Sequence, residues 1–246
     1  MRRLTRKRLA RFDVTRIRCL ALGLWAVVFL LGGCAGGAKH SVAVRHYVLE
    51  YPPPAFPGLE KASESVRLEP LSIARTFGTT AMVYRSKPFV YGDDAYNRWK
   101  IKPSAMISDL LLRDMRSAGL FAGVFSGGDA EGGDYTLSGF IEAMYEQEEK
   151  SGGRAVLALS VTLVDRSRRG PGGRPVFQKS YRSVQTMEAS DAEAMARAMS
   201  RAMETISREI VLDTYQAVRG GGDSAPETRS PHGLSAGQGP RVSSGF

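Results

Sequence analysis

The chain has 246 residues, which is enough for one domain of ordinary size with a core but short for two. Its formal net charge of +9 would suit a nucleic-acid-binding protein. However, residues 1–33 alone carry eight cations and one acid, so the rest of the chain has a net charge of only +2. A near-neutral remainder argues against a nucleic-acid partner.

The N-terminal segment has the three parts of a lipoprotein signal peptide. A basic stretch precedes the apolar run Cys19–Leu31, whose 13 residues are fewer than the ~20 that a membrane-spanning helix needs. Leu31-Gly32-Gly33-Cys34 then resembles a bacterial lipobox, in which small residues enter a peptidase and the cysteine thiolate takes up a diacylglyceryl group. We therefore predict a signal peptide over residues 1–33 and palmitate-containing lipid on Cys34. The alternative is an ordinary signal peptide or an uncleaved anchor with an incidental cysteine.

Lipidation also accounts for the cysteine count. Removal of residues 1–33 leaves Cys34 as the one cysteine, so the mature chain cannot form an internal disulfide. Two or three acyl chains make anchoring effectively permanent. Because Ala35, and not aspartate, follows the cysteine, resemblance to well-studied lipoproteins favours the outer membrane, facing the periplasm, over retention in the inner membrane.

Composition divides the mature chain into three parts. Residues 34–64 begin with glycine and alanine and continue with the proline-rich Pro52–Gly58, which indicates a lipidated N-terminus and tether. We expect the folded domain to cover residues 65–218. Glycine, serine and proline dominate residues 219–246, which are predicted to be a disordered tail.

Two strands and a helix are expected in the first half of the domain. Ser65–Ala74 alternates apolar and polar residues, but Pro70 restricts it to an edge or bulged strand. Thr80–Tyr84 is a second short strand candidate. Pro103–Ala118 has proline in its first turn, an apolar face and Gly119 as a stop, all typical of a helix.

Three strands and a second helix are expected in the second half. Glycine-rich turns separate the strand candidates Tyr135–Glu148, Arg154–Asp165 and Pro175–Met187, as in a meander of hairpins. Ser190–Val218 is predicted to be a helix in which Ser190 and Glu193 form a capping box. Its apolar stripe contains Met195, Met199, Met203, Ile206 and Ile210. The order of elements predicts a two-layer α+β domain, with a mainly antiparallel sheet and two helices on one face.

The sequence offers no catalytic, metal or cofactor site. His40, His46 and His232 all lie outside the expected domain, and no nucleophile elbow or phosphate-binding loop is present. Gly127–Asp134 has a weak likeness to calcium-binding repeats but is better interpreted as a polar turn. The acidic residues around Glu142–Glu149 are interpreted as a charged strand end, and the methionine stripe as core packing in preference to a lipid groove.

The order of several short motifs resembles the ABC-type transport auxiliary lipoproteins, the family of the small lipoprotein that accompanies the paraquat-inducible intermembrane transport proteins. Each motif is weak alone, and their order together with the lipobox makes the case. The motifs are His46-Tyr47-Val48-Leu49, Leu68-Glu69-Pro70-Leu71, Met82-Val83-Tyr84-Arg85-Ser86, Arg98-Trp99, Gly119-Leu120-Phe121 and Asp134-Tyr135-Thr136-Leu137.

The resemblance implies a component that is not an enzyme. Family members are thought to work with an ABC transporter and a periplasmic mammalian-cell-entry (MCE) domain protein that move lipids between the two membranes. By this reading the domain docks the MCE protein through exposed residues that include Tyr84, Arg85, Arg98 and Trp99, and the resemblance also allows a homo-oligomer. Trp99 could equally be a core or edge aromatic.

Two other functions remain open at the level of sequence. A lipoprotein activator of cell-wall (peptidoglycan) synthesis would have the same outline, although a long tether is expected of such a protein. A hydrolase is the third alternative, and the lack of a histidine in the domain argues against it.

Overall fold

The computed structural model describes residues 43–128, 132–149, 152–166 and 173–220. The predicted signal peptide, Cys34 and nearly all of the predicted tail lie outside the described residues. The predicted calcium-like turn is described only in part, because residues 129–131 are also outside.

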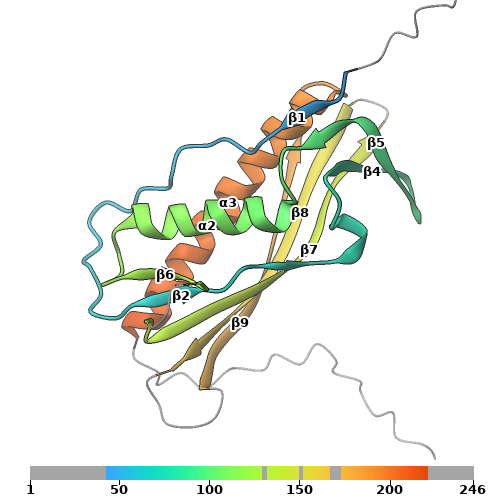
Figure 1. The fold of residues 1–246 in the computed structure, drawn as a ribbon. Coiled ribbons are helices and arrows are strands. Elements are labelled where there is room, and N and C mark those ends of the chain that lie inside the picture. Colours follow the sequence, from blue (N-terminus) through green and yellow to red (C-terminus); the bar gives the residue numbers. More distant parts are fainter. Residues whose placement is uncertain (1–42, 129–131, 150–151, 167–172, 221–246) are drawn as a thin grey trace, which may run out of the picture. The chain divides into compact units, whose positions relative to one another are not determined.

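Strand β7 (Tyr135–Glu149) organises the sheet (Figure 1). Along one edge it pairs in antiparallel register with β8 (Gly152–Asp165), which in turn pairs antiparallel with β9 (Arg174–Thr186). These three strands confirm the predicted meander. They occur where alternating apolar residues are separated by glycine-rich turns, because the turns permit a tight reversal and the alternation gives one buried face.

The other edge of β7 pairs with three short strands in succession. Its beginning, middle and end pair in parallel with β2 (Val66–Leu68), β3 (Ser72–Ile73) and β4 (Ala81–Lys87). Pro70 lies in the break between β2 and β3, since it has no N–H to donate. The predicted edge position is wrong for β2, which lies between β7 and β6 (Val124–Ser126).

The sheet continues from β4 into two strands that hydrophobic periodicity does not indicate. β5 (Val90–Trp99) pairs antiparallel with β4, and β1 (Arg45–Tyr47) pairs in parallel with the end of β5. The sheet is therefore mixed: its longest ladders are antiparallel, as expected, and its short pairs are parallel.

Both predicted helices are present. In α2 (Pro103–Ala118) proline is in the first turn, and Gly119 ends the helix with a left-handed φ of 65° and an N–H bonded to the Arg116 carbonyl. In α3 (Ala192–Arg219) the side chain of Asp191 accepts a hydrogen bond from the Ala194 N–H. The predicted Ser190–Glu193 capping box is thus wrong by one position: Asp191, an equally good N-cap, satisfies the free N–H. No helix in the described part of the chain is long and apolar enough to cross a membrane.

The two helices and one face of the sheet share a single apolar core, which confirms the α+β class. The methionine stripe of α3 belongs to this core: Met195, Met199 and Met203 are at most 2% exposed. Burying each such side chain contributes about 1.5–3 kcal/mol. The preference for core packing over a lipid groove is therefore correct for these three side chains.

A bulge in β7 gives the opposite face of the sheet a small core of its own. The regular register with β8 is interrupted between Ile141 and Ala143. Ile141 and Met144 pack in the main core, whereas Ala143 and Tyr145 pack on the other face with Phe77 from the short helix η1 (Arg75–Phe77). The bulge thus turns the end of β7 so that Glu146 follows Met144 onto the helix side.

The predicted tether is wrong for residues 45–64, which pack on the domain. Leu49 and Tyr51 are buried, and the Tyr51 hydroxyl donates a 2.6 Å hydrogen bond to Asp114 in α2. The Ala62 N–H bonds to the Leu120 carbonyl. Prolines make this segment extended, as expected, but its few apolar side chains find buried positions that a local pattern does not show.

Candidate functional site: an acidic cavity beside the β4–β5 hairpin

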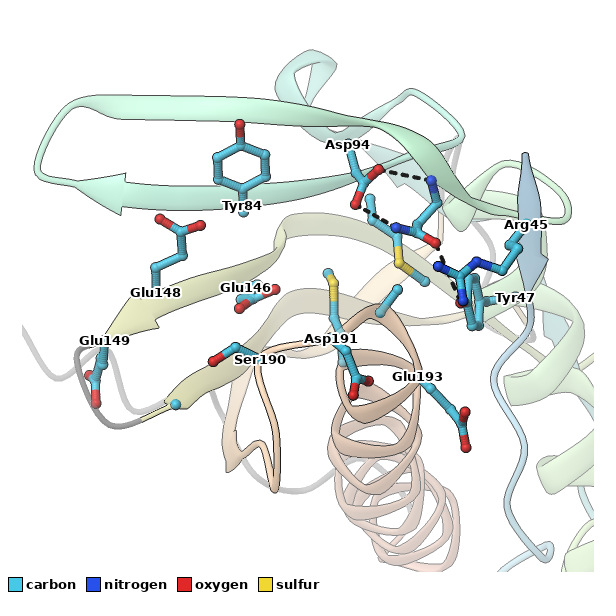
Figure 2. A pocket seen from close by; sticks show the side chains of 15 residues that line it. Arg45, Tyr47, Tyr84, Asp94, Glu146, Glu148, Glu149, Ser190, Asp191 and Glu193 are labelled. Carbon is cyan, nitrogen blue, oxygen red and sulfur yellow. Dashed lines mark hydrogen bonds between the residues drawn. The ribbon is translucent and has the colours of Figure 1, made fainter. Parts of the chain in front are cut away.

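A cavity of about 680 Å³ lies between the β4–β5 hairpin, the β7–β8 end and the start of α3 (Figure 2). Its wall is rich in carboxylates and includes one cation, Arg45. The carboxylates are Asp94, Glu146, Glu148, Glu149, Asp191 and Glu193.

Asp94 shapes the hairpin wall. Its Oδ1 accepts hydrogen bonds of 2.8 Å from the backbone N–H groups of Tyr96 and Asn97, and its Oδ2 accepts one of 2.8 Å from the Asn97 side chain. Partial burial alone would raise the pKa of Asp94, but these hydrogen bonds, with the nearby Arg45 charge, lower it below its ordinary value. The Tyr47 hydroxyl donates to Asn97 in turn, which links β1 to the same wall.

Glu146 lies on the floor of the cavity at the end of β7 (Figure 2). Burial raises the pKa of Glu146, and repulsion from Glu148, Asp191 and Asp94 raises it further. A carboxylate in this position is stabilised by any cation or hydrogen-bond donor that enters.

Tyr84 forms part of the hairpin side of the cavity, and Gly92 makes room for its ring. The two residues are paired across the hairpin. A Cβ atom on Gly92 would be only 2.5 Å from Cζ and Oη of Tyr84, so a side chain there would displace the ring. The position of Tyr84 therefore depends on glycine at residue 92.

The chemistry of the cavity suits recognition. No group of three or more His, Cys, Asp or Glu side chains in the described ranges is placed to hold a metal ion. The wall instead presents hydrogen-bond acceptors and negative charge, with Tyr84 on the hairpin side, an arrangement that is complementary to a positively charged surface on a partner.

The structure separates the four residues predicted to contact a partner. Tyr84 lines the cavity. Arg85 lies on the other face of β4, with its guanidinium 5.8 Å from the centre of the Tyr91 ring. Arg98 is half-buried in β5, between the register partners His46 and Ala81. Trp99 is 1% exposed and packs in the main core, so the core alternative holds and its indole is not available to a partner.

Sequence patterns do not indicate that Asp94, Asn97 and Arg45 belong to one site. The interpretation of the acidic residues around Glu142–Glu149 as a charged strand end is correct in position, since β7 ends at Glu149. What the sequence lacks is the pairing that brings β1, β5 and α3 around this strand end.

Comparisons with known proteins agree with the fold. The sequence model of a family described as the ABC-type transport auxiliary lipoprotein component matches residues 47–211. Among curated proteins, no sequence matches. Protein XCC0632 from Xanthomonas campestris, of family DUF330, is similar in structure with a TM-score of 0.65 and 19% identity, covering 72% of this chain and 98% of its own. A further crystal structure, of an uncharacterized protein, has a TM-score of 0.55 and 13% identity, covering 70% and 99%.

Proposed function

Because the chain belongs to the ABC-type transport auxiliary lipoprotein component family, we propose that it serves an ABC transporter that moves lipids between the inner and outer membranes. In this role the domain is not an enzyme. It is held at the outer membrane by lipid on Cys34, faces the periplasm, and docks the MCE-domain protein of the same system.

The observation that carries this proposal is the extent of the family match. It begins at Tyr47 in β1 and ends at Val211 in α3, so it includes the hairpin, the cavity wall apart from Arg45, and the buried N-terminal segment as one unit. The lipobox lies just upstream of that unit, as expected for a lipoprotein component.

The acidic cavity is the proposed contact for the MCE protein. Tyr84 provides an aromatic surface beside it, and the surrounding carboxylates provide charge that a basic segment of the partner would neutralise. Arg85 and Arg98 are proposed to support the hairpin that carries this surface.

The packed N-terminal segment weakens the cell-wall alternative. The first strand begins at Arg45, so ten residues separate it from Cys34, and the eleven steps along the chain span at most about 40 Å. A protein that must reach through the cell-wall mesh is expected to have a longer tether.

Two experiments in cells test the proposal. Palmitate labelling should be lost in the Cys34→Ala variant, and continued labelling would refute the lipobox. A photocrosslinking amino acid at position 84 should capture the MCE protein, whereas the same group at Gln178, an exposed residue of β9, should not. Capture of a cell-wall synthase at position 84 would favour the alternative function.

A further inference from the structure

The turn of the β4–β5 hairpin exposes an unusual aromatic residue. Pro88 and Phe89 connect the two strands, and the Phe89 side chain is 96% exposed. Val90 and Tyr91, which follow it, are 40% and 42% exposed. Figure 1 shows the hairpin extending away from the helices, so its tip is free of the domain core.

Phe89 is a costly residue for this turn. Its φ is 70°, the left-handed region in which glycine or asparagine is favoured after proline. Phe89 is the one non-glycine residue with a positive φ in the described ranges. A bulky ring that strains the backbone and contacts almost nothing in its own domain is best explained by a contact outside it.

The chemistry of the tip fits the boundary between lipid headgroups and acyl chains. Residues 85–92 contain two cations, Arg85 and Lys87, and no carboxylate. Aromatic and aliphatic side chains enter such a boundary readily, while lysine keeps its charge among the headgroups and is attracted to anionic lipid.

The anchor brings a membrane within reach of the tip. Arg45 in β1 is the register partner of Asn97 in β5. The chain that leads back toward Cys34 therefore leaves the domain beside β5, the second strand of the hairpin. Val90 lies seven residues from Asn97, at most about 24 Å along the strand, whereas the eleven steps of chain from Cys34 to Arg45 span up to about 40 Å.

We propose that the hairpin tip is a second membrane contact, in which Phe89 inserts into the lipid surface that holds the acylated Cys34. The inference rests on the lipid anchor of the proposed function. With two points of attachment, the acyl group and the tip, the domain would hold a defined orientation on the membrane.

Tryptophan fluorescence tests the insertion directly. The acylated mature chain is placed in vesicles of phosphatidylethanolamine and phosphatidylglycerol, with or without brominated acyl chains, which quench tryptophan on contact. Trp99 is buried and gives a constant background. The Phe89→Trp variant should show a blue-shifted emission and lose emission in brominated vesicles. The matched Tyr96→Trp variant, at an exposed aromatic of β5 away from the tip, should show neither change.

Flotation of the same vesicles separates the two proposals. Chains that fail to float show that the lipid anchor, and with it the proposed function, is wrong. Chains that float but show no quenching at position 89 overturn only the tip contact. Emission at position 89 could instead shift with protein concentration or with added MCE protein, and not with lipid. That result would assign the tip to a second copy or to the partner, and it would also overturn the proposed membrane contact.

The Phe89→Gly variant should keep or raise the melting temperature, because glycine relieves the strained backbone of the turn. A fall would show that Phe89 supports the fold.

Discussion

The Tyr51 hydroxyl donates a 2.6 Å hydrogen bond to Oδ2 of Asp114, across 63 residues of sequence. The Asp114 carboxylate is fully buried, and it also accepts bonds from Ser207 in α3 and from its neighbour Arg113. One carboxylate therefore joins the N-terminal segment to both helices.

Loss of this bond should loosen the N-terminal segment. Tyr51→Phe removes one donor to a buried charge, for which a cost of about 1.5–3 kcal/mol in unfolding free energy is expected. Tyr47→Phe is the matched control, since the Tyr47 hydroxyl bond to Asn97 is long, at 3.4 Å, and part-buried. Urea denaturation of both variants measures the difference. Equal stability of the two would show that the Tyr51 bond contributes little.

The raised pKa of Glu146 gives stability a defined pH dependence. The folded state holds the proton more tightly than the unfolded chain, so the favourable contribution is complete below the ordinary glutamate pKa and is lost as the pH rises through the raised value. We expect Glu146→Gln to melt at a higher temperature than wild type near neutral pH, with the difference vanishing below about pH 4. Glu142→Gln, at the exposed bulge, controls for net charge. A lower melting temperature for Glu146→Gln at neutral pH would contradict the electrostatic argument.

The Tyr84 ring can be displaced without touching the residue itself. Gly92→Ala puts a methyl group where the end of the Tyr84 side chain lies, and that flexible end can move away. We expect a small change in melting temperature but weaker binding of the MCE protein, as with Tyr84→Ala. Gly128→Ala is the control, because nothing lies within 4 Å of the added Cβ. Full binding by the Gly92→Ala chain would remove Tyr84 from the proposed contact.

The core assignment of Met203 predicts a large loss of stability. Met203 is 0% exposed in α3, and Met203→Asp would bury an unpaired charge. The cost should exceed the about 2–5 kcal/mol of a buried Met→Ala change, whereas Met203→Leu should cost less than about 1.5 kcal/mol. Thermal melting distinguishes the two. If Met203→Asp kept its stability and lost binding, the stripe would face a groove and not the core.

Local sequence patterns are sufficient to predict the type and position of the long helices and strands. α2, α3 and β8 each repeat one period over ten or more residues, and in β7 the repeat is interrupted by the bulge between Ile141 and Ala143. Glycine or proline lies near at least one end of each element. Their burial follows the predicted faces, as the buried methionines of α3 show.

The patterns failed where distant contacts decide the structure. β5 contains Gly92, Asp93, Asp94 and Asn97, which are poor strand formers, and its pairing with β4 and the Asp94 hydrogen bonds hold it in place. Sequence patterns assign the segment around Tyr51 to the tether because its partners, Asp114 among them, lie in other elements. Local patterns do not indicate the cavity either, because β1, β5, β7 and α3, which are distant in sequence, all contribute to its wall.

The most direct test of the account is co-purification from membranes. The full acylated chain, extracted in mild detergent from cells that also produce the MCE protein of the same system, should co-elute with that protein on size exclusion. The Tyr84→Ala chain should be labelled with palmitate but elute alone. Separate elution of the wild-type chain and the MCE protein, together with retention of a cell-wall synthase by the wild-type chain, would contradict the proposed function.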